Sequence, residues 1–242
     1  MINTKGQGSA KSLTGLIYPL IIFVSEVGHP WTSLQKQQIL RLRGEAEHWI
    51  CDQSRIYNSH LAFHRGGNFG YENDIVVDFI PQATGSNDEY SHWVAYLLQK
   101  IGWDPLDLNS KLIKESGSTH LHVEMYANKA GRSYAIPFCQ GADNQKFFME
   151  GAFIYRFYQN SSELLSASIA HEILHLYGAW DLYHNCDVTK DQTMHALRLF
   201  PNDIMVRIDT SIDKLSISPL TAWRIGWTEF KEDWYDFFDP HR

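Results

Sequence analysis

The chain has 242 residues, 44% hydrophobic and 14% aromatic, which is enough apolar material for one compact domain with a substantial core. Its 28 acidic residues outnumber 21 basic ones, giving a net charge of −7 without a long basic cluster, so we expect no nucleic-acid partner. No apolar stretch approaches the roughly 20 residues of a membrane span, and three widely spaced cysteines, Cys51, Cys139 and Cys186, predict reduced thiols rather than a disulfide framework.

An apolar run near the N-terminus, Leu16–Val24, predicts the first core strand. Lys5 and Lys11 precede it, as in a secretory signal, but Pro19 interrupts the run and no small-residue cleavage site follows it. We therefore expect synthesis in the cytoplasm without a cleavable signal. The alternative is delivery elsewhere by another route, as for an exported effector or toxin.

Strands and helices are predicted to alternate through the middle of the chain. Thr32, with Gln35 three residues later, predicts the capped start of a helix with an apolar stripe. Strand-like pieces follow within 61–81, and a second helix is predicted over 88–101. Residues 121–138 alternate apolar and polar side chains around a turn, which predicts a β-hairpin.

The most informative segment is His-Glu-Ile-Leu-His at 171–175, on a predicted helix. His171 and His175 are four residues apart and project from one helix face, so both imidazoles can reach a single ion. Glu172 then lies beside the ion without binding it, where it can accept a proton from a zinc-bound water. This is the arrangement of a zinc hydrolase.

The ends of this helix bear on the third ligand. Asn160 with Glu163 predicts its capped start, and Gly178 predicts its end, because glycine adopts the left-handed conformation of a sharp turn. The turn would bring a later residue back toward the metal. Asp181 is the candidate ligand, because a carboxylate oxygen binds zinc at about 2.0–2.2 Å. His184 competes with it, since imidazole is an equally good ligand.

The segment resembles the extended zinc motif of the metzincin metalloproteases, in the variant with aspartate where most members have a third histidine: it reads His171-Glu172-x-x-His175-x-x-Gly178-x-x-Asp181. Residues 178–183 are also similar to the Gly-Leu-Pro-Asp-Leu-Tyr segment of immune inhibitor A-like peptidases, with Trp180 in place of the proline. Downstream, Asn202–Met205 resembles the turn whose methionine lies beneath the zinc in metzincins. Residues 218–227 resemble the short helix that follows.

The resemblance spans about residues 160–227 and implies an α+β, metzincin-like zincin fold. Such a fold has a twisted mixed sheet, an active-site helix and a smaller, loop-rich C-terminal subdomain. Here the N-terminal subdomain would span about 1–178, and the C-terminal subdomain, with the turn at Met205, about 179–242. The two together would form a single catalytic domain.

The resemblance also implies a zinc-dependent endopeptidase. One Zn²⁺ ion would be held by His171, His175 and Asp181, with Glu172 as the general base that activates the attacking water. The partner would be a protein or peptide substrate, extended along an edge strand of the sheet, for which the hairpin of 121–138 is the candidate. Three further residues are candidates for stabilising the oxyanion: Tyr177, Tyr183 and His195.

Two other functions are compatible with the sequence. One is a different zinc amide hydrolase, acting on cell-wall or terminal peptides. Peptide deformylases also use a His-Glu-x-x-His helix, but this chain lacks their Glu-Gly-Cys-Leu-Ser segment. The other is a catalytically silent, zinc-stabilised binding module. Glu172 argues against this module, because a purely structural zinc site has no use for a base beside the metal.

Overall fold

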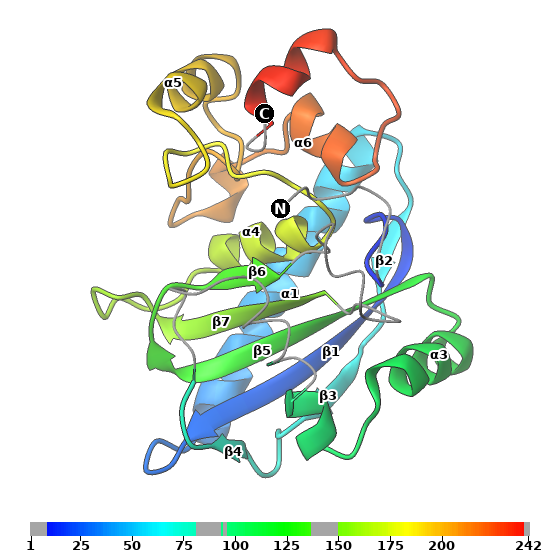
Figure 1. Cartoon of the computed structure of the whole chain (residues 1–242), viewed down its shortest axis with the longest axis vertical. Helices are drawn as coiled ribbons and strands as arrows, with labels where there is room; N and C mark the ends of the chain where they lie inside the picture. Colours follow the sequence, from blue (N-terminus) through cyan, green and yellow to red (C-terminus); the bar gives the residue numbers. More distant parts are fainter. Residues whose placement is uncertain (1–8, 81–92, 94–95, 137–149, 240–242) are drawn as a thin grey trace.

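A computed structural model of the protein describes residues 9–80, 93, 96–136 and 150–239, and its centre is a mixed sheet of seven strands (Figure 1). The strand order is β2-β1-β5-β7-β6, with β3 and β4 also pairing with β1. The strands are β1 (Gly15–Glu26), β2 (Leu61–Phe63), β3 (Gly67–Phe69), β4 (Ile75–Val77), β5 (His120–Ala130), β6 (Tyr134–Ile136) and β7 (Gly151–Phe157). All neighbouring strands are parallel except β6, which runs antiparallel to β7 at one edge.

Helices cover both faces of this sheet. They are α1 (Ser33–Ile56), α3 (Pro105–Ser116), α4 (Ser166–Leu176), α5 (Lys190–Leu199) and α6 (Pro219–Arg224), with 3-10 turns η1 (Ile212–Lys214) and η2 (Asp233–Phe238). The core on one face is shared with α1 and α4, and the core on the other with α3 and the helical residues 96–100. The elements after α4 gather beside it, at the top of Figure 1. The protein is therefore a mixed α/β fold.

The predicted N-terminal strand is confirmed as β1, which is longer than predicted. Ile17 and Ile21 face the core shared with α1 and α4, whereas Leu20 faces the opposite core. A parallel strand covered on both faces is apolar at every position, which explains the continuous run in the sequence. The helix predicted from Thr32 is also confirmed, because Thr32 and Gln35 form the capping box of α1.

On the side of β1 away from β5, the strand-like pieces predicted within 61–81 are the three short strands β2, β3 and β4, which pair with β1 in succession. Gly66 and Gly70 separate them, both with φ above +70°. A Cβ on Gly66 would lie 2.3 Å from the carbonyl oxygen of Pro19, and one on Gly70 would lie 2.6 Å from that of Phe23. Only glycine fits so close to β1, and the edge strand is broken there.

The hairpin predicted over 121–138 is wrong. Its first half is β5, whose parallel neighbours are β1 and β7, and its second half contains β6, which pairs with β7 instead. The alternation was misleading because the polar residues His122 and Glu124 are fully buried and do not mark a solvent-facing side. The edge strand of the sheet on this side is β6.

Two helices were not predicted. One is α3, and the other is α5, within a segment taken as loop after Gly178. A sequence signal for α5 existed, since Thr189 and Gln192 form a complete capping box. Half of the helix predicted over 88–101 lies outside the described residues, and of the other half Trp93 and residues 96–100 are helical.

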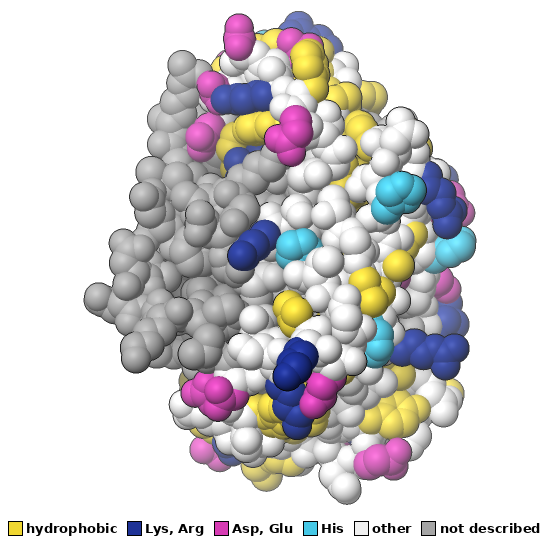
Figure 2. Space-filling view, turned by 90° about the vertical axis from the view of Figure 1, so that its right-hand side faces the viewer, with side chains coloured by type: hydrophobic (Ala, Val, Ile, Leu, Met, Phe, Trp, Pro, Cys, Tyr) yellow, Lys and Arg dark blue, Asp and Glu magenta, His cyan; other side chains and the backbone are white. Residues whose placement is uncertain are grey.

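The surface and the cysteines add three observations. On the face drawn in Figure 2, Lys and Arg side chains are scattered among acidic and neutral ones. Cys51 and Cys186 are free thiols, and Cys139 lies outside the described residues. None of the described helices has the length and apolar character needed to cross a bilayer.

A buried polar network links α1, β5 and the end of α4. The Glu124 carboxylate accepts bonds from Arg43 Nε at 2.9 Å and from the Tyr126 hydroxyl at 2.6 Å. Its other oxygen lies 2.9 Å from His122 Nε2. His122 Nδ1 lies 2.8 Å from the hydroxyl of Tyr177, the residue that ends α4. The helix with the histidine motif is thus tied to the centre of the sheet.

We expect Glu124→Gln to destabilise the fold by about 1.5–3 kcal/mol, because it removes the fully buried carboxylate from the Arg43 guanidinium, which then keeps only its second ion pair, with Glu47. Glu45→Gln is the matched control, since Glu45 forms an exposed ion pair with Arg41 on α1 and should contribute at most about 1 kcal/mol. Urea unfolding followed by tryptophan fluorescence would measure both. Equal effects of the two substitutions would contradict the role given to the network.

The loss of stability in Glu124→Gln should depend on pH. Burial alone would raise the pKa of Glu124, but the Arg43 guanidinium outweighs it and lowers this pKa from 4.5 to about 2. A carboxylate whose pKa is lowered by folding stabilises the fold above its unfolded pKa, and this contribution is lost as pH falls toward the folded pKa. The difference in unfolding free energy between wild type and Glu124→Gln should therefore shrink between about pH 5 and pH 2.

Candidate metal centre

The histidine motif lies on α4, which is buried on almost every side and packs against α1, β6 and β7. The predicted cap at Asn160 is wrong: the residue before the helix is Leu165, which makes no side-chain capping bond. Asn160 instead accepts bonds from the backbone and hydroxyl of Ser162. A bridge between Phe157 and Glu163 continues strand pairing past β7, so the chain is still extended where the capping pattern predicted a helix.

The turn after α4 follows the prediction at Gly178, which has φ +99°. Arg224 of α6 fixes this turn, because its Nε donates to the Gly178 carbonyl at 2.8 Å. The Arg224 guanidinium also lies 4.1 Å from the centre of the Trp180 ring. This stacking gives Trp180 a definite place in the turn.

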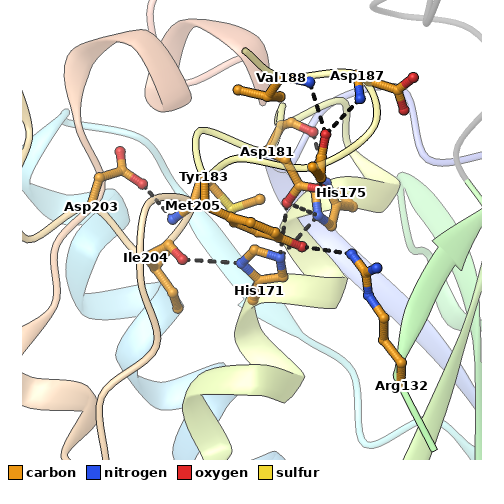
Figure 3. A network of polar contacts seen from close by, with 12 residues as sticks. Arg132, His171, His175, Asp181, Tyr183, Asp187, Val188, Asp203, Ile204 and Met205 are labelled. Carbon is orange, nitrogen blue, oxygen red and sulfur yellow. Dashed lines mark hydrogen bonds and ion pairs between the residues drawn. The ribbon is translucent and has the colours of Figure 1, made fainter. Parts of the chain in front are cut away.

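The turn brings Asp181 against the two histidines of α4 (Figure 3). The Nε2 atoms of His171 and His175 lie 3.0 Å apart. Asp181 Oδ1 lies 3.3 Å from the first Nε2 and 3.1 Å from the second. Among the described residues, these three form the cluster of His, Cys, Asp and Glu side chains that could hold a metal ion.

The hydrogen bonds around the cluster orient its ligand atoms. His171 Nδ1 lies 3.0 Å from the Ile204 carbonyl, and His175 Nδ1 lies 2.9 Å from the Ala179 carbonyl. A carbonyl only accepts, so each Nδ1 carries a hydrogen, and each Nε2, once deprotonated, directs its lone pair to the common centre. Asp181 Oδ1 is buried there without a hydrogen bond, while its Oδ2 accepts from Asn185. This donor set fits a zinc ion.

The electrostatics of the cluster also favour a cation. Burial alone would lower the pKa of His175, but the Asp181 carboxylate outweighs burial and raises it to about 9. Burial opposes ionisation of Asp181 as well, yet the nearby His175 holds the pKa of Asp181 well below its usual range. In the metal-free protein, His175 therefore carries a proton next to the ionised Asp181 carboxylate. A metal ion would take the place of that proton.

A cleft of about 700 Å³ opens beside the cluster, and both His171 and Glu172 line it. Glu172 is buried, which raises the pKa of its carboxyl above the usual value. It does not belong to the three-residue cluster. The arrangement therefore offers two ligand nitrogens, one ligand carboxylate and a separate carboxylate that can exchange protons.

The predicted turn at Met205 packs against the same site. Met205 is fully buried, and its carbonyl accepts from the amide of Leu182, next to Asp181. Asp203 stabilises the turn, because its carboxylate accepts from the Met205 amide at 2.6 Å and from Ser218 and Thr221 at the start of α6. The short helix expected within residues 218–227 is α6, which Ser218 caps and Pro219 begins.

The remaining sequence candidates lie in different places. His184 is outside the cluster, with its Nδ1 2.8 Å from the Val188 carbonyl. Of the oxyanion candidates, Tyr177 is buried against His122, and His195 lies on α5 against Phe237. Tyr183 alone of the three lines the cleft, with its ring 6.0 Å from that of His171.

Sequence reasoning missed several features of the site. The Ile204 and Ala179 carbonyls orient the histidines, but backbone atoms leave no mark in a residue pattern. Asp203 lies within the predicted turn at 202–205, but the sequence pattern gives it no role of its own. Arg132, which lines the cleft from the connection between β5 and β6, was assigned no role.

A scan against models of known protein families finds no match to this chain, and a search of curated protein sequences finds none either. The interpretation of the site therefore depends on its motif and its geometry.

Proposed function

We propose that the protein is a zinc-dependent metallopeptidase with a metzincin-like catalytic domain. The observation that carries this proposal is the convergence of His171 Nε2, His175 Nε2 and Asp181 Oδ1 beside a cleft lined by Glu172. A structural zinc site usually has four protein ligands, whereas this group offers three and leaves room for a water. The buried Met205 turn, which carries the carbonyl that orients His171, supports the same proposal.

When bound, zinc would supply a Lewis acid that acidifies a water and polarises the substrate carbonyl. The protein's own residues do the rest. Glu172 accepts the proton of the attacking water and then donates it to the leaving amine nitrogen. Burial suits Glu172 to this task, because it raises the pKa of the carboxyl and so makes the carboxylate a stronger base.

Substrate binding is proposed along β6. Among the described residues, this strand lies at the edge of the sheet, next to α4, and the residues just before it line the cleft. An extended peptide can add to such an edge through backbone hydrogen bonds and present its carbonyl to the metal. The substrate edge is thus at residues 134–136, within the segment proposed from the sequence but not in a hairpin.

The test is hydrolysis of a mixed peptide library by the purified protein. We expect cleavage that is lost on treatment with a chelator and restored by one equivalent of zinc per chain. Circular dichroism before and after chelation would show whether the fold survives metal removal. Cleavage that chelation leaves unchanged, or no cleavage by the fully zinc-loaded protein, would overturn the proposal and favour a binding module.

A further inference from the structure

One cation lies at the cleft in a position that the proposed chemistry does not use. Arg132 is exposed, follows β5 directly and lines the same cleft as His171 and Glu172. Its Nη2 donates to the Tyr183 hydroxyl at 3.2 Å, and Figure 3 shows the guanidinium extended toward the metal cluster. Its charge is close enough to act on both Asp181 and Glu172.

The backbone around Arg132 is held firmly against β7. Gly131 donates its amide to the Phe157 carbonyl at 3.0 Å, and the side-chain hydroxyl of Ser133 accepts from the Tyr155 amide at 3.1 Å. A Cβ on Gly131 would lie 2.5 Å from the Tyr155 ring, so only glycine allows this close approach. Arg132 is therefore fixed at its base by the sheet and at its tip by Tyr183.

The charge of Arg132 is not neutralised by any described carboxylate within ion-pair distance. The second arginine at the cleft differs, because Arg207 forms an ion pair with Asp209 at 2.5 Å. Tyr183 carries a hydroxyl and no carboxylate, and it occupies one of the five guanidinium N–H donors. The remaining N–H donors of the Arg132 guanidinium can thus still bind a carboxylate in the cleft.

We propose that Arg132 binds a carboxylate of the substrate next to the scissile bond, so that the cleft selects peptides with an acidic group there. This inference rests on the proposed function for the location of that bond. The carboxylate belongs either to an acidic side chain or to the C-terminus of the peptide, since both present the same two oxygens. Tyr183 is the positioning residue that orients the guanidinium, and the peptide passes Arg132 as it adds to β6.

Binding is measured first, independently of turnover. Zinc-loaded Glu172→Gln protein is titrated into fluorescein-labelled peptides, and anisotropy gives the dissociation constant. Four peptides differ only at one central residue, glutamate or glutamine, and at the C-terminus, free or amidated. Loss of the central carboxylate or loss of the terminal one identifies which source is bound.

In this background, Arg132→Gln should weaken binding of the preferred carboxylate peptide by about 10- to 100-fold, as expected for a charge-assisted hydrogen-bonded pair. The uncharged peptide should change by no more than about twofold. Arg132→Lys should restore only part of the affinity, because ammonium keeps the charge but lacks the fork. Arg198→Gln, on the exposed side of α5, controls for net charge. Arg132→Glu should reverse the preference toward a peptide with central lysine.

The outcomes separate the two proposals. An equal loss for charged and uncharged peptides in Arg132→Gln, or no preference for a carboxylate in the parent protein, overturns the inference. Carboxylate-selective binding through Arg132 without chelator-sensitive hydrolysis overturns the proposed function and its scissile bond, but supports Arg132 as the group that binds a carboxylate in the cleft. If hydrolysis is present, Arg132→Gln should raise KM for the acidic peptide far more than it lowers kcat.

Discussion

Glu172→Gln should lower peptide hydrolysis by about 10²–10⁴-fold, the range associated with loss of a general base. The amide has nearly the shape of the carboxylate but cannot accept the proton of the attacking water. Because Glu172 is not one of the three clustered residues, the variant should keep its stoichiometric metal and its fold. This variant should thus lose its activity while keeping its affinity for the metal.

The measurement combines metal content by atomic absorption with initial rates on the best peptide from the library. Glu229→Gln is the matched control, because it removes the same charge at an exposed position outside the cleft. Full activity in Glu172→Gln would remove this residue from the mechanism. A variant that loses both activity and metal would mean instead that Glu172 contributes to metal binding.

The cluster was predictable because its geometry is mostly local. Two histidines four residues apart on a helix must share a face, and a glycine three residues later allows the sharp turn. His171, His175 and Asp181 lie within eleven consecutive residues, so short-range rules sufficed to bring them together. The choice of Asp181 over His184 was less certain from spacing, and the structure places Asp181 in the cluster.

The strand order was not predictable in the same way. Whether β5 pairs directly with β6, or β7 lies between the two in the sheet, depends on strands that are far away in the sequence. The deciding contact is the pairing of β5 with Gly151–Phe157, a segment that carried no recognised strand signal. The buried pair of Glu124 with Arg43 then gave β5 a polar alternation without an exposed face.

Arg132 illustrates the same limit at the site. Nothing in its neighbours marks it as functional, since it is a single arginine next to a glycine in an expected turn. Its position at the cleft follows from three long-range facts: β6 lies beside β7, Gly131 packs on Tyr155, and the turn after α4 returns Tyr183 to the same place. Only the assembled fold brings these segments together.

The second large effect concerns the metal ligands. His171→Ala and His175→Ala should each abolish tight zinc binding, because each removes one of the two imidazole nitrogens. Asp181→Ala should weaken binding by more than about 100-fold, beyond the 10- to 100-fold expected for loss of an outer hydrogen-bond partner. Asn185→Ala supplies that comparison, since Asn185 donates to Asp181 Oδ2 at 2.9 Å without touching the centre.

His184→Ala is the decisive control in this series, because His184 lies on the same loop and was the alternative third ligand. Its imidazole contacts the Val188 carbonyl instead of the cluster, so its removal should change zinc affinity by less than the loss of Asn185 does. Competition titration with a chromophoric chelator would rank all five variants, and thermal unfolding of the metal-free proteins would show that each still folds. If His184→Ala proves more damaging than Asp181→Ala, then the metal draws the loop into another arrangement, and the third ligand is the histidine.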